Sequence, residues 1–219
     1  MTRDPGRSRP ATAYRQRAES LLALLRTHFG LPRAGRTVIA VAGESGSGKS
    51  VTAIDLAAML DEAGIASAII HQDNYFVRPP RTNHDFRVAD ITSVGPQEVQ
   101  MDLIAAHIAA FRAGAPSVTA PVVDYPGNRF LTQVLDFSAT QVLVVEGTFA
   151  LLLDDADIRI FLEATYLDTR QRRQLRARDV DDPFVEQVLD IEHRIIAAQA
   201  PRADILIDSD YAVRLRSAT

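Results

Sequence analysis

The 219-residue chain contains no cysteine, which excludes disulfides, thiolate metal sites and cysteine nucleophiles. It also has no apolar run that approaches the roughly 20 residues of a membrane-spanning helix, and its first residues lack the apolar core of a signal peptide. A formal net charge of −4 argues against a general nucleic-acid binder, because such proteins are usually basic. We therefore expect a cytoplasmic protein that has no nucleic-acid or membrane partner.

Lysine is almost absent as well. Lysine and arginine together number 24, and all of them except Lys49 are arginine. An ammonium is a compact point charge, whereas a guanidinium is a wide planar fork. Lys49 lies in residues 43–50, which read GESGSGKS and match the pattern G-x-x-x-x-G-K-[ST]. A loop that closes around phosphate has room for the ammonium and not for the fork, so the pattern indicates a phosphate site.

The surroundings of this loop fit the same interpretation. Residues 37–42 form a β-branched apolar run typical of a buried parallel strand, and residues 51–63 have the pattern of a helix. In such a loop the backbone N–H groups point at phosphate oxygens, Lys49 reaches the β- and γ-phosphates, and the Ser50 hydroxyl binds Mg²⁺. The expected ATP-binding residues are Gly43, Ser45, Gly46, Ser47, Gly48, Lys49, Ser50 and Val51. The alternative, a glycine-rich turn without a ligand, is disfavoured by the order of strand, loop and helix.

The length of the chain suits one α/β domain. Residues 1–10 are rich in arginine and proline and have little to bury, so we expect a disordered tail followed by a single domain over residues 11–219. Predicted strands lie at 37–42, 66–70, 118–124, 141–145, 158–162 and 204–207, and predicted helices at 18–29, 51–63, 96–111, 167–178 and 183–200. Residues 74–95 have no clear pattern and are expected to be irregular. Alternation of strands with helices predicts a parallel sheet covered by helices.

Two carboxylates follow predicted strands. Asp73 comes after the second strand, and Glu146 ends the apolar run 143–145. Because parallel strands end at one edge of a sheet, both acids are expected near the phosphate loop. One acid can help to hold Mg²⁺, and the other can take the proton of an acceptor hydroxyl. A helix cap or a surface acid is the alternative for each of them alone.

Arginines are concentrated between residues 170 and 178. One interpretation is a lid whose guanidinium groups cover a triphosphate and neutralise developing charge. The alternative is a solvated helix face, which must hold for some of them because five guanidinium groups cannot all reach one phosphate. We expect one or two to be functional.

Histidines and aromatic residues give weaker signals. His107 lies in a helical pattern and is expected to be a packing or surface residue, whereas His71 and His84 flank the expected site. The aromatic residues near the site can stack on a flat ring or belong to the core, and the sequence leaves both open: Tyr75, Phe76, Tyr125 and Phe130.

Over residues 36–210 the chain resembles the uridine kinase and phosphoribulokinase branch of the P-loop kinases. Five segments carry the resemblance: residues 43–50 (GESGSGKS), 73–76 (DNYF), 123–125 (VDY), 145–147 (VEG), and 168–170 (DTR) with 178–179 (RD). The resemblance implies a P-loop NTPase fold, a three-layer α/β/α arrangement with a mostly parallel central sheet and a small helical lid over residues 170–185. It also implies ATP and Mg²⁺ as cofactors.

The resemblance assigns roles to particular residues. Lys49 and a lid arginine, Arg173 or Arg178, would neutralise charge, Asp73 would be the base, and Ser50 with Glu146 would hold Mg²⁺. The expected acceptor-binding residues are Tyr75, Asp124, Tyr125, Asn128 and Arg129.

The chain departs from the family where the nucleoside is bound. Val94-Gly95-Pro96 replaces an acid followed by His-Pro, Val123 replaces a tyrosine, and Asn128 stands where a histidine is usual. The lid continues as Asp181-Asp182-Pro183 instead of with further arginines. These departures leave the identity of the acceptor open.

We therefore expect an ATP-dependent small-molecule kinase, similar to uridine kinase, that transfers the γ-phosphoryl group to a hydroxyl of a nucleoside or related metabolite. One alternative is an anionic or non-nucleoside acceptor, such as pantothenate, a phosphorylated sugar or a glycerate-like acid, bound by arginines 78, 81, 87 and 129. Another is a non-catalytic ATP-binding regulator. A GTPase is disfavoured because its guanine-binding segment needs a second lysine. The oligomeric state, a homo-oligomer included, stays open.

Overall fold

The structure is a computed structural model that describes residues 11–175 and 183–217, with side chains described for residues 13–170 and 183–217. The expected tail, 1–10, and the lid residues 176–182 therefore lie outside the described residues. None of the described helices combines the length and the apolar content needed to cross a bilayer.

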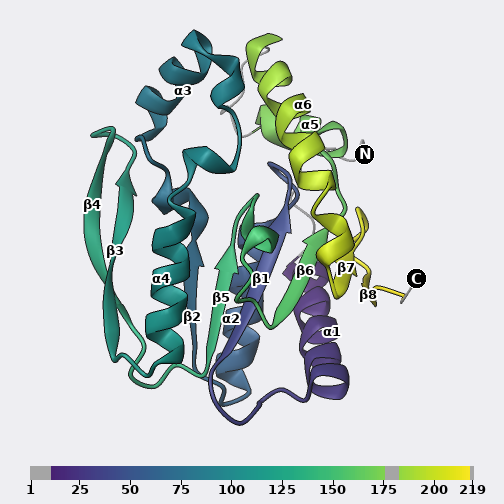
Figure 1. Cartoon of the computed structure of the whole chain (residues 1–219). Helices are drawn as coiled ribbons and strands as arrows, with labels where there is room; N and C mark the ends of the chain where they lie inside the picture. The colour runs from purple at the N-terminus through teal and green to yellow at the C-terminus, as the bar shows by residue number, and fades with distance from the viewer. Residues whose placement is uncertain (1–10, 176–182, 218–219) are drawn as a thin grey trace.

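A six-stranded sheet forms the centre of the molecule (Figure 1). Its strands, in spatial order, are β2 (Ser67–His71), β5 (Val142–Glu146), β1 (Thr37–Gly43), β6 (Ile158–Leu162), β7 (Ile205–Ile207) and β8 (Val213–Leu215). Neighbouring strands are parallel except β7 and β8, which pair antiparallel. β1 and β5 are buried along their whole length, as expected for apolar strands covered on both faces. The predicted strands of the sheet are thus confirmed.

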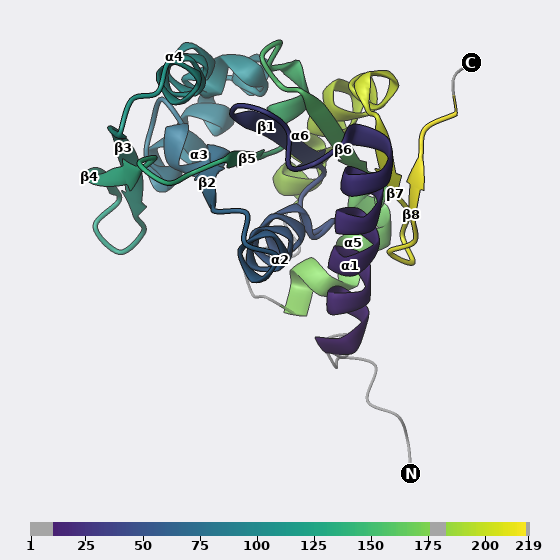
Figure 2. The same ribbon diagram turned by 90° about the horizontal axis from the view of Figure 1, so that it is seen from below.

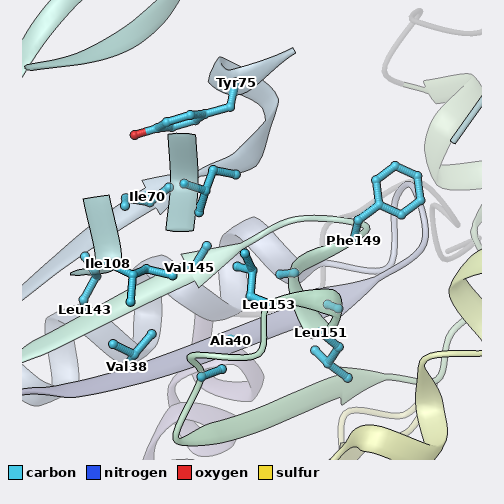
Figure 3. Packing of buried hydrophobic residues seen from close by; sticks show 14 of the residues in the cluster. Val38, Ala40, Ile70, Tyr75, Ile108, Leu143, Val145, Phe149, Leu151 and Leu153 are labelled. Carbon is cyan, nitrogen blue, oxygen red and sulfur yellow. The ribbon is translucent and has the colours of Figure 1, made fainter. Parts of the chain in front are cut away.

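Helices cover both faces of this sheet (Figure 2). Because side chains alternate along a strand, Val38 and Ala40 of β1 point into one core and Ile39 and Val41 into the other. The first core packs against α4 (Met101–Arg112) and the end of α6 (Pro183–Ala197), and Figure 3 shows it from close by. The second core packs against α1 (Ala11–Phe29) and α2 (Lys49–Glu62). The predicted three-layer arrangement is therefore confirmed.

The stretch 74–95, expected to be irregular, contains the helix α3 (Pro80–Ala89). The pair Pro79-Pro80 indicates a break in regular structure, but Pro80 occupies the first helical position, where its missing N–H is not needed. The next predicted helix starts later than expected. Pro96–Glu98 forms a separate 3₁₀ turn, and α4 begins at Met101.

An antiparallel hairpin joins β3 (Ser117–Asp124) to β4 (Arg129–Asp136), outside the main sheet. The sequence predicted β3 but not β4. Most of β4 is exposed, so it lacks the apolar alternation that identifies a strand with one buried face. The turn between the strands places Asn128 at φ 49°, a left-handed conformation that asparagine tolerates better than most residues.

Candidate nucleotide and acceptor site

The loop between β1 and α2 has the shape of a phosphate cradle. Gly46 and Gly48 adopt φ angles of 75° and 101°, which side chains with a Cβ rarely adopt. A Cβ on Gly43 would lie 2.7 Å from the Ser47 hydroxyl and 2.9 Å from the Leu162 side chain, so the loop can fold back only on glycine. Lys49 is the first residue of α2, whose N-terminal end favours anions. The predicted nucleotide-binding residues are therefore brought together in a form that fits a polyphosphate.

A hydroxyl and a carboxylate meet beside this loop. The Ser50 hydroxyl donates to Glu146 Oε2 at 3.1 Å, and the Glu146 side chain is only 3% exposed. β1 and β5 run parallel with Val41 opposite Glu146, so the end of β5 lies next to the start of the loop. Hard oxygen donors of this kind suit Mg²⁺, which binds few protein ligands and keeps several waters. The described residues contain no cluster of three or more His, Cys, Asp or Glu side chains placed to hold a metal.

Glu146 has a second partner on the neighbouring strand. His71 Nδ1 lies 2.8 Å from Glu146 Oε1, and the two residues face each other in the register of β2 and β5. The hydrogen bond to Glu146 raises the pKa of His71, although burial acts in the opposite direction. His71 therefore contacts the expected metal ligand directly, a role that the sequence did not assign.

Gly147 fixes the strand ends around Glu146. A Cβ at this position would lie 2.3 Å from the Cβ of Gln72, which follows β2. Gln72 is fully buried, and its Oε1 accepts a hydrogen bond from the Phe149 backbone N–H at 3.0 Å. In the pair Glu146-Gly147, the first residue supplies a carboxylate, and the second lets the chain after β5 pass close to Gln72 after β2.

Asp73 and Lys49 line the same cavity, which has a volume of ≈ 370 Å³. Asp73 lies in the 3₁₀ turn Gln72–Tyr75 that follows β2. Most of the remaining lining comes from α3, from the hairpin and from α6: Pro80, Asn83, His84, Arg87, Val123, Tyr125, Phe184, Val185, Val188, Leu189 and Glu192. Phe76 and Arg78 before α3, Thr148 after β5 and Ser45 of the phosphate loop complete it. A phosphate held by Lys49 and an acceptor in this cavity would be close to Asp73.

Of the five residues expected to bind the acceptor, Tyr125 lines the cavity and four do not. Tyr75 is 1% exposed, and its hydroxyl lies 2.9 Å from His107 Nδ1 (Figure 3 shows the ring packed beside the core). Burial raises the pKa of Tyr75 and lowers that of His107, so the neutral hydroxyl donates to the neutral ring. The expected packing role of His107 is confirmed, and Tyr75 is placed as a core residue.

The other three residues hold the hairpin tip. The Asp124 carboxylate accepts hydrogen bonds from the Gly127 backbone N–H and from Arg129 Nε, and the first of these contributes most to lowering the Asp124 pKa. Asn128 Oδ1 accepts from the Arg81 backbone N–H at 2.8 Å, and its amide donates to Thr82. Asn128 thus attaches the hairpin to α3, whereas Asp124 and Arg129 hold the turn itself, and none of the three lines the cavity.

Glu44 connects the phosphate loop to the helices that flank the lid. Its Oε2 accepts from the Tyr166 backbone N–H at 2.6 Å, at the start of α5 (Tyr166–Leu175), and its Oε1 lies 2.7 Å from His193 Nδ1 on α6. This role could not be predicted from the sequence, because Glu44 occupies a variable position of the motif. The side chain of Arg173 and the whole of Arg178 lie outside the described residues, so their lid roles stay predictions.

The model of the Phosphoribulokinase / Uridine kinase family matches residues 38–182. The chain belongs to this family. Its members are kinases that phosphorylate hydroxyl acceptors, so the coarse prediction of a P-loop kinase is confirmed.

Curated relatives of the chain include a bifunctional enzyme with a sucrose kinase activity in its name and several uridine kinases. The chain is 29% identical over 192 residues to the bifunctional alpha-galactosidase/sucrose kinase AgaSK of Mediterraneibacter gnavus, a match that covers 81% of this chain and 20% of that protein. It is 28% identical over 184 residues to a uridine kinase of Staphylococcus aureus (strain JH9), covering 78% of this chain and 86% of the relative. The chain therefore spans only a fifth of the length of the first relative.

Solved structures support the fold. A possible uridine kinase from Bacillus stearothermophilus superimposes with a TM-score of 0.59 at 20% identity, covering 88% of this chain and 97% of that one. Phosphoribulokinase from Rhodobacter spheroides gives a TM-score of 0.61 at 14% identity, covering 83% and 80%. At these identities the likeness establishes the P-loop kinase fold alone.

Proposed function

We propose that the protein is an ATP- and Mg²⁺-dependent kinase that phosphorylates a hydroxyl group of a small molecule bound in the cavity. The observation that carries this proposal is that Lys49 of the phosphate loop and Asp73 line one cavity. A phosphoryl donor and an acceptor hydroxyl must meet between such groups for transfer to occur.

Each residue has a defined part in the proposed reaction. Asp73 accepts the proton of the acceptor hydroxyl. At the same time the oxygen of that hydroxyl forms a bond to the γ-phosphorus, and the bond between this phosphorus and the oxygen of ADP breaks. Lys49 and the loop amides hold the phosphates and neutralise their charge. Ser50 and Glu146 would hold Mg²⁺, which supplies further charge neutralisation when bound. A lid arginine, Arg173 or Arg178, is proposed to act on the same phosphates.

Relatives support a neutral acceptor. The names of the two relatives include sucrose and uridine, and both compounds are uncharged molecules with several hydroxyl groups. Three of the four arginines considered for an anionic acceptor give little support to it, because Arg81 and Arg129 do not line the cavity and Arg87 is paired with carboxylates. The cytoplasm is the proposed location.

Release of ADP in the presence of candidate acceptors tests the proposal. Asp73→Asn is expected to lower kcat by about 10²- to 10⁴-fold, the usual contribution of a general base, while ATP still binds. Lys49→Ala should weaken ATP binding as well. Asp102→Asn, an exposed acid on α4, is the matched control and should keep full activity.

Two results would contradict the proposal. Full turnover by Asp73→Asn would remove the base from the mechanism. Binding of ATP without ADP release with any acceptor would instead favour a non-catalytic ATP-binding regulator.

A further inference from the structure

One wall of the cavity has polar groups to which the proposed kinase mechanism assigns no role. Asn83 and Arg87 come from α3, and Glu192 comes from α6, so they reach the cavity from two different helices (Figure 1). Resting on the proposed kinase function, we propose that Asn83 and Glu192, oriented by Arg87, bind the hydroxyl groups of a neutral sugar that serves as the acceptor.

Asn83 provides the clearest evidence. The residue is 6% exposed and lines the cavity. Its amide nitrogen donates to Glu98 Oε1 at 2.8 Å, whereas its carbonyl oxygen Oδ1 is buried without a hydrogen-bond partner among the described residues. A buried polar atom without a partner costs about 1–3 kcal/mol, so it calls for a donor from a ligand. A hydroxyl group supplies such a donor.

Arg87 holds this corner in place. Its Nε and Nη2 donate to the two carboxylate oxygens of Glu98 at 2.6 and 2.7 Å, and Nη2 also lies 2.9 Å from Glu192 Oε1. The side chains of Glu98 and Glu192 are 1% and 13% exposed. This fixed arrangement presents carboxylate and amide oxygens, which accept hydrogen bonds from hydroxyl groups.

The charges of this corner disfavour an anion. Two carboxylates meet one guanidinium, so Arg87 has no surplus positive charge for an acidic acceptor. Arg129 pairs with Asp124, and Arg81 donates to the Pro126 carbonyl. Arg78 lines the cavity, but it lies over the Phe86 ring with its guanidinium carbon 3.6 Å from the ring centre. This contact leaves the charge of Arg78 in place. Because Arg87 is balanced by two carboxylates and Arg81 and Arg129 do not line the cavity, a neutral ligand fits the described groups better than a phosphorylated one.

A nucleoside is disfavoured for a different reason. Asp124 belongs to the segment that resembles the family's nucleoside-contacting segment, and Asn128 stands where that family usually has a histidine, yet both residues hold the hairpin tip and neither lines the cavity. The apolar part of the wall, with Phe184 and Val188 on α6, suits the C–H faces of a sugar ring.

An acceptor panel is the first test. Initial rates of ADP release are measured with neutral sugars (sucrose and glucose), with uridine, and with the anions glycerate and ribose 5-phosphate. We expect the highest kcat/KM with one of the neutral sugars. A higher kcat/KM with uridine or an anion than with every neutral sugar would overturn the assignment and leave the kinase function intact.

Two variants test the residues themselves. Asn83→Leu keeps the volume and removes the carbonyl oxygen, so the acceptor kcat/KM should fall about tenfold or more while the KM for ATP is unchanged. Glu192→Gln is similar in size, preserves an acceptor oxygen and should raise the acceptor KM by a smaller factor. Asp85→Asn, on the exposed face of α3, is the matched control.

Calorimetric titration of each protein with the same sugars separates the two proposals. If no acceptor is phosphorylated, the kinase function fails, but sugar binding that is lost in Asn83→Leu still supports the sugar site. No sugar binding to the wild type, or equal binding to wild type and both variants, would overturn it. Unfolding curves for each variant check that a change in binding does not reflect a misfolded protein.

Discussion

The phosphate side and the acceptor side of the cavity are built from different kinds of structure. The phosphate side consists of one continuous loop on a fully buried strand, with Glu146 delivered by the neighbouring buried strand. The acceptor side is assembled from α3, the β3–β4 hairpin and α6, which are far apart in the sequence and partly exposed. Under the proposed function, the groups that bind phosphate are positioned by the core of the sheet, whereas the groups that select the acceptor come from elements packed on its margin.

This difference explains how variation can be tolerated. A residue on α3 or α6 can change without disturbing β1 or β5, because those strands are held by both hydrophobic cores. A change at the strand ends affects the phosphate loop directly. The names of two relatives of similar identity, which include sucrose and uridine, are consistent with this division.

The largest effect is expected at the phosphate side from Glu146→Gln. The amide keeps the shape but loses the charge beside Ser50, so kcat should fall by about 100-fold or more, with a higher Mg²⁺ concentration needed for half-maximal rate. Measuring ADP release against Mg²⁺ concentration tests this. An unchanged Mg²⁺ dependence would remove Glu146 from the metal site, and the exposed Glu62→Gln serves as control.

A smaller effect, on both stability and rate, is expected from Gly147→Ala. The new methyl group would lie 2.3 Å from the Gln72 Cβ, so the ends of β2 and β5 must separate. Overpacking of this kind costs about 1–3 kcal/mol of unfolding free energy. Because Asp73 and Glu146 stand at these strand ends, kcat should fall as well.

Denaturant unfolding and initial rates measure the two effects of this change. Gly114→Ala is the comparison, because its φ of 88° is also unfavourable for alanine but a Cβ there meets nothing within 4 Å. Gly114→Ala should lose stability and keep kcat. Equal kcat losses in the two variants would show that strand separation at Gly147 has no special role.

The two sides also differ in how far the sequence predicted them. The loop, Asp73 and Glu146 lie together as the sequence led us to expect, because a local motif and the rule that parallel strands end at one edge are enough to predict their proximity. Asn83 and Glu192 could not be predicted, since each is an ordinary polar residue until α3 and α6 pack around one cavity. The helix α3 was not predicted because the pair Pro79-Pro80 usually indicates a break in regular structure. The strand β4 was not predicted because most of its residues are exposed and show no clear apolar alternation. The acceptor side is formed by tertiary contacts between segments far apart in the sequence, and such contacts leave no local sequence pattern from which to predict them.

The smallest effect is expected beneath the acceptor side, at the buried pair of Tyr75 and His107. Burial lowers the pKa of His107 below the unfolded value of about 6.5, so above that pH the pair contributes its full stability. As the pH falls below about 6.5, the unfolded chain takes up the proton first, and this contribution is progressively lost until the pH passes the folded pKa.

His107→Gln can still accept from the Tyr75 hydroxyl but does not titrate. Unfolding free energies measured between pH 8 and pH 5 should therefore fall less steeply for the variant than for the wild type. Parallel curves would mean that His107 titrates alike in the folded and unfolded chains, and that this buried pair does not make the acceptor side sensitive to acid.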